Sequence, residues 1–229
     1  MNFLNYQIDL YLKLCRYYVF REANSSWIKD VHPLTLNCLG EEDIVSVAPY
    51  KDQTGMRMLI YKIGSWKPSK IPMDELFKAT LILMEIGSLE PRAQILGGIG
   101  LFDLEGLSLT HTWHMSPSVA QKIISIMVTC MPYRSTAIHV VNQNWVFDAV
   151  YHMFKPFLNE QMRARIFFHG NNWKSLHKHI DPDHLPKKYG GVHENHSYKL
   201  WIDYLKNNEY VVSELEKQKY SIAPLQAEK

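Results

Sequence analysis

Residues 95–106 read ILGGIGLFDLEG, an apolar run that ends in two acidic residues and a glycine. Such a run is typical of a β-strand buried on both faces, and we expect that strand over residues 95–102. A dinucleotide-binding fingerprint requires a strand before its glycines and a helix directly after them, whereas these glycines lead into a strand. The stretch therefore predicts a central strand against which a helix packs closely, and it does not indicate a nucleotide site.

The chain on either side of this strand alternates between helix-like and strand-like segments. We expect helices over residues 2–21, 73–88, 116–131, 145–158 and 196–215, and strands over residues 44–48, 58–64, 136–141 and 166–169, besides the central one. Strands that alternate with helices in this way favour right-handed crossover connections. The prediction is an α/β fold: a mostly parallel five-stranded sheet flanked by helices.

Composition excludes several classes of protein. The 229 residues are 46% apolar and 21% charged, and 25 basic against 23 acidic residues give a net charge of +2. That charge is too small for a general nucleic-acid binder, and no apolar stretch reaches the roughly 18 residues that span a bilayer. Three widely spaced cysteines, Cys15, Cys38 and Cys130, fit a reducing compartment. We expect a cytoplasmic protein, monomeric, with no nucleic-acid partner.

Metal-binding and catalytic patterns are weak. The histidines and aspartates of residues 177–184 match no zinc-binding spacing, so surface histidines are the better interpretation. Asp103 and Glu105 follow the central strand, where α/β enzymes place catalytic groups, but the chain has no Gly-x-Ser-x-Gly sequence. We expect no metal, no cofactor and no enzymatic activity, and keep a hydrolase that uses Asp103 as a third hypothesis.

The segment from Asn142 to Leu158 is apolar around well over half of its helical circumference. Asp148, His152 and Lys155 form its only polar stripe. One interpretation is a helix buried on two sides. The other is a lid, with one apolar face over a cavity and another free to meet a bilayer.

Arginines lie close to this segment in the sequence. Arg134 precedes the strand before it, and Arg163 and Arg165 follow it. Guanidinium groups beside an apolar lid suit the binding of a lipid phosphate, because they bind phosphate bidentately. A solvated basic surface is the alternative.

Seven short motifs then show a family resemblance. They are MLIY at 58–61, FDLEG at 102–106, SPSVA at 116–120, IHVVN at 138–142, KPFL at 155–158, Arg165 with HGNN at 169–172, and LP at 185–186 with YGG at 189–191. In order and spacing they resemble the CRAL-TRIO (Sec14-like) lipid-binding family, in the branch of α-tocopherol transfer, retinaldehyde-binding and clavesin proteins. The resemblance covers residues 12–215.

The resemblance implies binding and transfer of one small hydrophobic lipid, tocopherol-, retinoid- or isoprenoid-like, under a gate helix at 142–158, with reversible docking on membranes. The implied ligand-binding residues are Tyr61, Phe77, Thr80, Leu81, Met84, Phe102, Ile123, Ile126, Met127, Met131, Ile138, Val140, Phe147, Val150 and Phe154. The implied phosphoinositide-binding residues are Arg134, Arg163 and Arg165. Thr136 and Gln161 stand where the branch has basic residues, so the phosphoinositide site departs from the family pattern.

The resemblance also divides the chain. Residues 1–30 resemble the last helix of an amino-terminal helical module, residues 31–215 form the lipid-binding domain, and residues 216–229 are a polar tail. Two functions follow as hypotheses. The first is lipid transfer with phosphoinositide-dependent membrane docking; the alternative is a phosphoinositide-sensing trafficking adaptor of the clavesin type.

Overall fold

The computed structural model describes residues 3–29, 31–40, 42–131, 134–195 and 197–222. The strands are β1 (Val45–Val47), β2 (Arg57–Lys62), β3 (Gly98–Asp103), β4 (Ser135–Val141) and β5 (Ile166–Gly170). The α-helices are α1 (Phe3–Ala23), α2 (Met73–Ser88), α3 (Pro91–Leu96), α4 (Leu109–Thr112), α5 (Pro117–Ile124), α6 (Trp145–Phe154), α7 (Glu160–Arg163), α8 (Trp173–Leu176), α9 (Lys199–Lys206) and α10 (Glu209–Lys217).

Short helical turns complete the chain. They are the 3₁₀ turns η1 (Ser25–Trp27), η2 (Pro33–Thr35), η3 (Ile63–Ser65), η5 (Lys155–Phe157), η6 (Pro182–His184) and η7 (Lys187–Tyr189), and the π-helical η4 (Ser125–Cys130).

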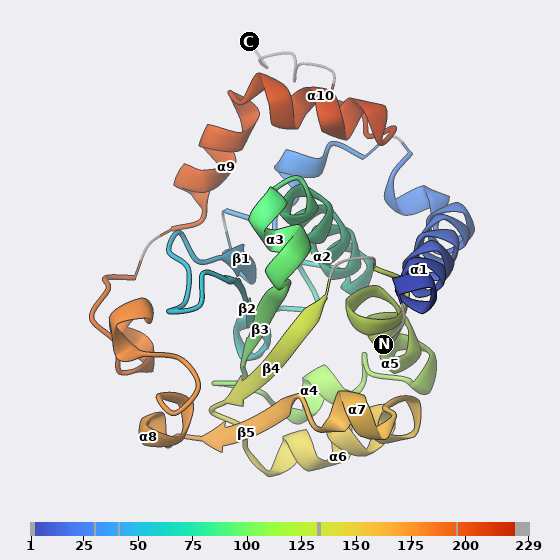
Figure 1. Cartoon of the computed structure of the whole chain (residues 1–229). Helices are drawn as coiled ribbons and strands as arrows, with labels where there is room; N and C mark the ends of the chain where they lie inside the picture. Colours follow the sequence, from blue (N-terminus) through green and yellow to red (C-terminus); the bar gives the residue numbers. More distant parts are fainter. Residues whose placement is uncertain (1–2, 30, 41, 132–133, 196, 223–229) are drawn as a thin grey trace.

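The five strands form one sheet in the order β1-β2-β3-β4-β5 (Figure 1). β1 pairs with β2 in the antiparallel sense, and every other pair is parallel. The α/β class and the mostly parallel five-stranded sheet predicted from the sequence are therefore confirmed. Because β3, β4 and β5 run parallel, their amino-terminal ends lie together on one side of the sheet and their carboxyl-terminal ends lie together on the opposite side.

The two faces of the sheet are covered differently. On one face, alternate side chains of β2 and β3 such as Ile60 and Leu101 pack against Leu176, Ile180 and Leu185, from α8 and the segment that follows it. The other face is turned toward α2, η4 and α6. Alternation along the strands thus separates a packed side from a side that contains a cavity.

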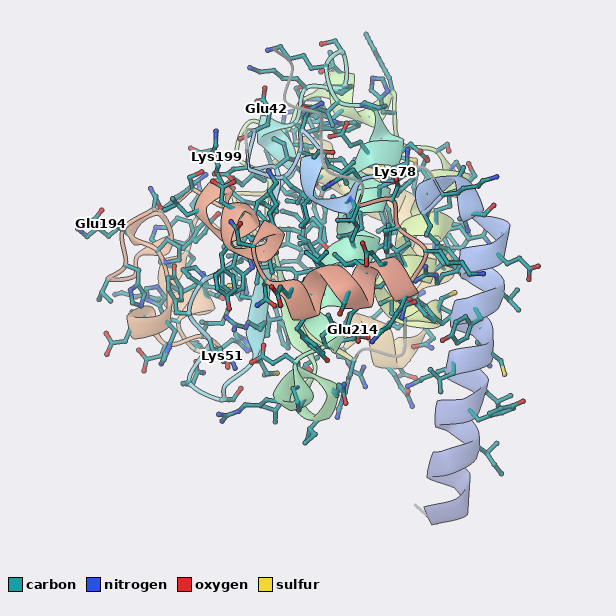
Figure 2. All side chains as sticks on the ribbon, turned by 90° about the horizontal axis from the view of Figure 1, so that it is seen from above. Glu42, Lys51, Lys78, Glu194, Lys199 and Glu214 are labelled. Carbon is teal, nitrogen blue, oxygen red and sulfur yellow. The ribbon has the colours of Figure 1, made fainter. Side chains whose placement is uncertain are left out.

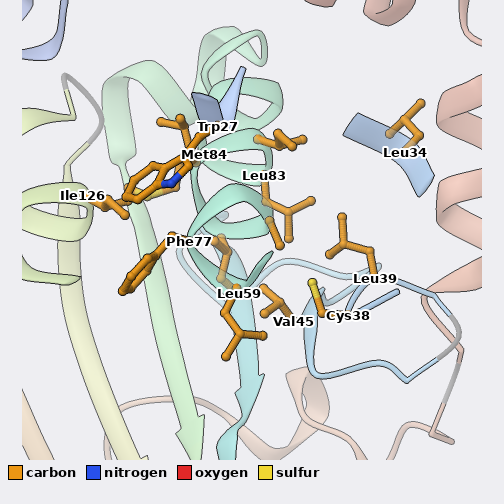
Figure 3. Packing of buried hydrophobic residues seen from close by; sticks show 14 of the residues in the cluster. Trp27, Leu34, Cys38, Leu39, Val45, Leu59, Phe77, Leu83, Met84 and Ile126 are labelled. Atoms are coloured by element: carbon orange, nitrogen blue, oxygen red, sulfur yellow. The ribbon is translucent and has the colours of Figure 1, made fainter. Parts of the chain in front are cut away.

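Helix α2 anchors the second face. Its buried side chains include Phe77, Leu83 and Met84, which belong to one core cluster with Trp27 and Ile126 (Figure 3). The Phe77 and Trp27 rings lie 5.3 Å apart. This cluster fixes the position of the helix whose first half forms a cavity wall.

Three elements differ from the sequence prediction. The expected strand over 95–102 begins only at Gly98, because residues 91–96 form α3 and Ile95 is 79% exposed. Gly97 makes the turn between them with φ +81°, and a Cβ there would lie 2.2 Å from the Arg134 carbonyl oxygen. The predicted helix 116–131 changes to a π-helical turn after Ile124. The last predicted helix breaks at residues 207–208 into α9 and α10.

Helix α1 is joined to the body through one buried ion pair. Arg21 Nη1 lies 2.5 Å from Glu85 Oε1, and Tyr17 donates a hydrogen bond to the same carboxylate. Burial raises the pKa of Glu85, although Arg21 opposes that shift. Arg21 also donates to the Gln218 carbonyl oxygen, and Tyr220 is buried nearby. The start of the predicted polar tail therefore packs against α1 and α2.

The amino-terminal half of α1 extends beyond the rest of the chain (Figure 2). Large apolar side chains are exposed along it, among them Ile8 at 49% and Tyr11 at 67%. Contacts with η4 and the Arg21 ion pair hold α1 on the rest of the chain.

Histidines stack on the packed side of the sheet. His139 Nδ1 lies 3.0 Å from His169 Nε2, and His169 Nδ1 lies 2.9 Å from the Ser175 hydroxyl oxygen. Burial, together with the neighbouring imidazoles of His169 and His179, lowers the pKa of His139 to about 3. Burial and His179 lower the pKa of His169 to about 4. Both rings are neutral in the folded protein near pH 7.

This cluster predicts acid sensitivity. In the unfolded chain histidine has a pKa near 6.5, so between pH 6.5 and 3 it binds a proton that buried His139 does not bind. The free energy of unfolding therefore has its full value above pH 6.5 and falls as the pH drops toward 3. At pH 5 the loss through His139 is on the order of 2 kcal/mol. We expect His139→Leu to reduce the difference in urea-unfolding free energy between pH 7 and pH 5. His152→Leu, on the exposed side of α6, should retain the wild-type difference. An equal acid loss in wild type and His139→Leu would contradict this assignment.

Candidate functional site

An apolar cavity of about 160 Å³ lies between the sheet, α2, the α5–η4 segment and α6. Its lining comprises Tyr61, Ile63, Trp66, Met73, Leu76, Phe77, Thr80, Phe102, Leu104, Leu107, His111, Met115, Ile123, Ile124, Ile126, Met127, Val128, Ile138, Val140, Phe147, Val150, Tyr151, Phe154, Leu158, Ile166 and Phe168. Nearly all of these side chains are hydrocarbon or aromatic. The cavity therefore suits a ligand that is itself mostly hydrocarbon.

Alternate residues of the sheet form the cavity floor. Ile138 and Val140 of β4 and Ile166 and Phe168 of β5 face it, while His139 between them faces the packed side. The Tyr61 and Phe102 rings stack 4.5 Å apart on β2 and β3. The two-residue period of a strand thus gives the cavity a continuous apolar floor.

The hydrogen-bonding groups of Thr80 and His111 in the wall are already engaged. The Thr80 hydroxyl donates to the Leu76 carbonyl oxygen at 2.8 Å. His111 Nδ1 accepts from the Ser108 backbone N–H at 3.1 Å, so Nε2 carries the proton and donates to the Trp66 carbonyl oxygen at 2.9 Å. These side chains therefore offer a ligand no free N–H or O–H donor.

Helix α6 covers the cavity and is fixed at its beginning by Asn144. The Asn144 side chain accepts from the Val146 backbone N–H at 3.0 Å and donates to the Leu107 carbonyl oxygen at 2.8 Å. The Phe147 and Tyr151 rings pack on Phe168 of β5, with centroids 5.6 Å and 5.1 Å away. The cover is therefore held by one polar cap and by aromatic contacts along its inner face.

The expectation that α6 is apolar on two faces is wrong. Its outward side carries Asp148, Ala149 and His152, and Trp145 is its one large apolar side chain that is strongly exposed, at 70%. Further exposed apolar surface lies on α4 next to it, where Trp113 is 80% and Leu109 is 52% exposed. The apolar arc read from the sequence is used mainly to line the cavity.

The structure places twelve of the fifteen predicted ligand-binding residues at the cavity wall. They are Tyr61, Phe77, Thr80, Phe102, Ile123, Ile126, Met127, Ile138, Val140, Phe147, Val150 and Phe154. Leu81, Met84 and Met131 do not line it; they are buried in the core cluster around α2. The lining residues of α2 end at Thr80, whereas Leu81 and Met84 follow Phe77 and Thr80 by one turn and so lie further along the helix, beyond the cavity.

Sequence reasoning missed several wall residues. Ile166 and Phe168 could have been found, because they alternate on the strand already predicted at 166–169. Trp66 lies in an irregular segment after η3, and His111 lies in the four-residue helix α4; both segments are too short for periodicity to indicate which side chain turns inward.

The three predicted basic residues divide into two places. Arg134 is exposed where β4 begins, and Arg165 Nη1 lies 3.4 Å from the Ser135 carbonyl oxygen, so these two lie at the same sheet edge. Arg163 instead donates from Nη2 to the Lys155 carbonyl oxygen at 2.9 Å. It therefore binds the segment that ends the cavity cover.

Asp103 forms a structural cross-link. Its Oδ1 accepts from Asn142 Nδ2 at 2.8 Å and from the Glu105 backbone N–H at 3.0 Å, and its Oδ2 accepts from Tyr189 and Lys188 at 3.1 Å and 2.6 Å. Burial alone would raise the pKa of Asp103, but the hydrogen bonds from Asn142 and Lys188 hold it below its usual value. Each oxygen has two donors, so the carboxylate joins the ends of β3 and β4 to η7.

Known proteins resemble this chain in sequence and in fold. Residues 41–191 match the sequence profile of the CRAL/TRIO domain, which is more than half of the chain. The chain belongs to the CRAL/TRIO domain family. This CRAL/TRIO chain is 31% identical over 179 residues to "Alpha-tocopherol transfer protein-like" of Mus musculus and 29% identical over 214 residues to "Clavesin-1" of Rattus norvegicus.

Those matches cover 78% and 90% of this chain, but 52% and 60% of the two relatives. The CRAL/TRIO chain thus spans about half to three fifths of the length of these proteins. Among solved structures, the crystal structure of Sfh5 superposes with a TM-score of 0.52 at 20% identity, covering 80% of this chain and 69% of that one. That likeness concerns the fold.

The described residues show neither a metal cluster nor a membrane-spanning helix. No group of three or more His, Cys, Asp or Glu side chains among them is arranged to hold a metal ion. No helix within the described ranges combines the length and apolarity needed to cross a membrane.

The cap of α6 predicts local control of the cover. Replacing Asn144 with Ala removes the cap and the bond to Leu107, which should cost about 1–2 kcal/mol and speed amide hydrogen exchange over residues 145–154. Asn208→Ala removes a similar cap, made to the Val211 N–H of α10, and serves as the matched control. If both variants leave exchange in α6 equally slow, Asn144 does not control the cover.

Proposed function

We propose that this protein binds one small hydrophobic lipid in the cavity under α6 and transfers it between membranes. The observation that carries the proposal is the apolar cavity itself, enclosed by the sheet and by a cover helix that a single cap and aromatic contacts hold. Its CRAL/TRIO family binds and transfers lipids, which agrees with that chemistry.

The free energy available from such a site is large. Burying several hundred Å² of ligand surface at about 25 cal/mol per Å² gives on the order of 10 kcal/mol before ordering costs. Ligand sites usually have volumes of about 300 Å³ or more, and this cavity has about 160 Å³. Binding a whole lipid therefore requires α6 and the side chains beneath it to move outward.

The exposed apolar side chains beside the cover suggest where release occurs. Leu109 of α4, Trp113 directly after α4 and Trp145 at the start of α6 form a set that we name the docking edge. α4 packs on α6, and Asn144 binds the Leu107 carbonyl, so the three lie close to the base of the cover. Tryptophan favours the interface between bilayer and water. Docking this edge would bring the cover to a membrane, where a ligand can leave without entering water.

The ligand class follows from the wall chemistry. The relative from Mus musculus is named for α-tocopherol transfer, and a tocopherol-, retinoid- or isoprenoid-like molecule is mostly hydrocarbon, which suits the cavity wall. The Thr80 hydroxyl is already donated to Leu76, so a hydroxyl on the ligand would find only an acceptor there. We therefore favour a ligand whose single polar group lies at the cavity mouth.

Filling the cavity tests this function. Met127→Trp places an indole among the wall side chains and should weaken binding of cis-parinaric acid, followed by its fluorescence, by about tenfold or more, because the added ring competes with the ligand for space. Met162→Trp on α7, outside the lining, is the matched control. Full binding by a folded Met127→Trp variant would contradict the proposal.

A second function is supported by the paired arginines at the β4–β5 edge. Phosphoinositide binding by Arg134 and Arg165 would make membrane docking depend on the phosphoinositide content of the membrane, or would support a trafficking adaptor. Relatives named clavesin are 29–31% identical to this chain. The edge bears two guanidinium groups but also Thr136 and Gln161. Lipid transfer remains our main proposal, because it accounts for the apolar cavity, whereas the adaptor function leaves the cavity unused.

Charge removal tests that dependence. The double variant Arg134→Ala, Arg165→Ala should weaken binding to phosphatidylinositol-bisphosphate vesicles by about tenfold, because bidentate phosphate contacts are lost, and leave cis-parinaric acid binding unchanged. Lys174→Ala with Lys178→Ala, both exposed on the packed side of the sheet, removes the same charge elsewhere. An equal loss in both double variants would mean that only net charge matters. Loss of function in the arginine variant, with Met127→Trp fully active, would favour the adaptor.

A further inference from the structure

A second hollow of about 780 Å³ lies between α4 and the turn that follows β2. We name it the outer groove and define it by Ser65, Lys67 and Ser69 on one side and Trp113 and His114 on the other. It is separate from the arginines at the beginning of β4 and β5, because α4 follows the opposite end of β3.

A rigid partition divides the outer groove from the cavity. Trp66 and His111 line both hollows. Trp66 Nε1 donates to the Ile71 carbonyl oxygen at 2.8 Å, and both ring nitrogens of His111 are engaged. The partition therefore supplies the groove with a wall but no free hydrogen-bonding side chain.

Four other polar residues of the groove have side chains without a polar partner in the described residues. Within the part of the chain that the structure describes, the side chains of Ser65, Lys67, Ser69 and His114 make no hydrogen bond or ion pair with the protein. Glu42 also lines the groove (labelled in Figure 2), but Lys70 lies 4.0 Å from its carboxylate. One unneutralised ammonium group and two hydroxyls therefore converge on the groove.

We propose that the outer groove binds the phosphate of a lipid headgroup in the bilayer on which the protein docks. An ammonium with neighbouring hydroxyl and imidazole groups supplies charge-assisted and neutral hydrogen bonds to phosphate oxygens. Trp113 forms one wall of the groove and belongs to the docking edge, so the groove faces the depth at which headgroup phosphates lie. This inference rests on the proposed membrane docking and adds its headgroup contact.

Vesicle sedimentation of the full chain tests the groove. Wild type should bind phosphatidylcholine vesicles that contain phosphatidate more tightly than pure phosphatidylcholine vesicles. Lys67→Glu should weaken binding to the phosphatidate vesicles by about tenfold, the value of one charge-assisted hydrogen bond, and leave binding to pure phosphatidylcholine unchanged. Lys174→Glu, exposed on the packed side of the sheet and away from the groove, makes the same charge change and should weaken binding by less than about twofold.

Equal losses in Lys67→Glu and Lys174→Glu would overturn the groove as a site, since general charge attraction would explain them. Displacement of the protein from phosphatidate vesicles by inorganic phosphate at millimolar concentration would also overturn it, because the groove would then bind free phosphate. Unchanged cis-parinaric acid binding in Lys67→Glu separates this inference from the cavity. If Trp113→Ala loses binding to both kinds of vesicle while Lys67→Glu binds as wild type, docking stands and the groove fails.

Discussion

The apolar cavity beneath α6 is the constraint on which the other features depend. Left unfilled, a cavity of about 160 Å³ would forfeit packing worth about 4 kcal/mol, at roughly 24 cal/mol per Å³, in a domain whose net stability is typically about 5–15 kcal/mol. The protein offsets this with dense packing elsewhere. The far face of the sheet is closed by Leu176, Ile180 and Leu185, and α2 is embedded in a large core around Trp27. A ligand that fills the void restores the missing contacts and so stabilises the closed form.

The cover of that void is attached differently at its two ends. At its beginning, Asn144 joins α6 to the segment before α4, beside the exposed tryptophans. After its end, the Lys155 carbonyl accepts a hydrogen bond from Arg163, which follows in α7 near the arginine-bearing sheet edge. Both attachments are polar bonds at or near the surface, and the contacts between them are apolar. A membrane surface can therefore reach the attachments without passing through the core.

The sequence predicted the sheet and most of the cavity wall because both obey simple periods. Alternation along the strands and the inner arc of the cover gave Ile138, Val140, Phe147 and Val150 their correct places. Prediction failed where a local backbone event decides the geometry. Gly97 ends a short helix inside what reads as a continuous strand, and the break at residues 207–208 divides one amphipathic pattern into two helices. The outer groove left no periodic signal, because two irregular segments that are distant in the chain form it.

Alternate residues of strand β4 face the cavity and the packed side of the sheet. Ile138 and Val140 border the void, whereas His139 and Val141 belong to the packed side. A substitution at a void-facing position meets open space, so it can change in size without displacing neighbours, whereas the intervening positions are constrained by close contacts. Under the proposed function, single mutations at the void-facing positions can therefore change ligand preference while the scaffold keeps its folding free energy, which lets this architecture evolve toward other hydrophobic ligands.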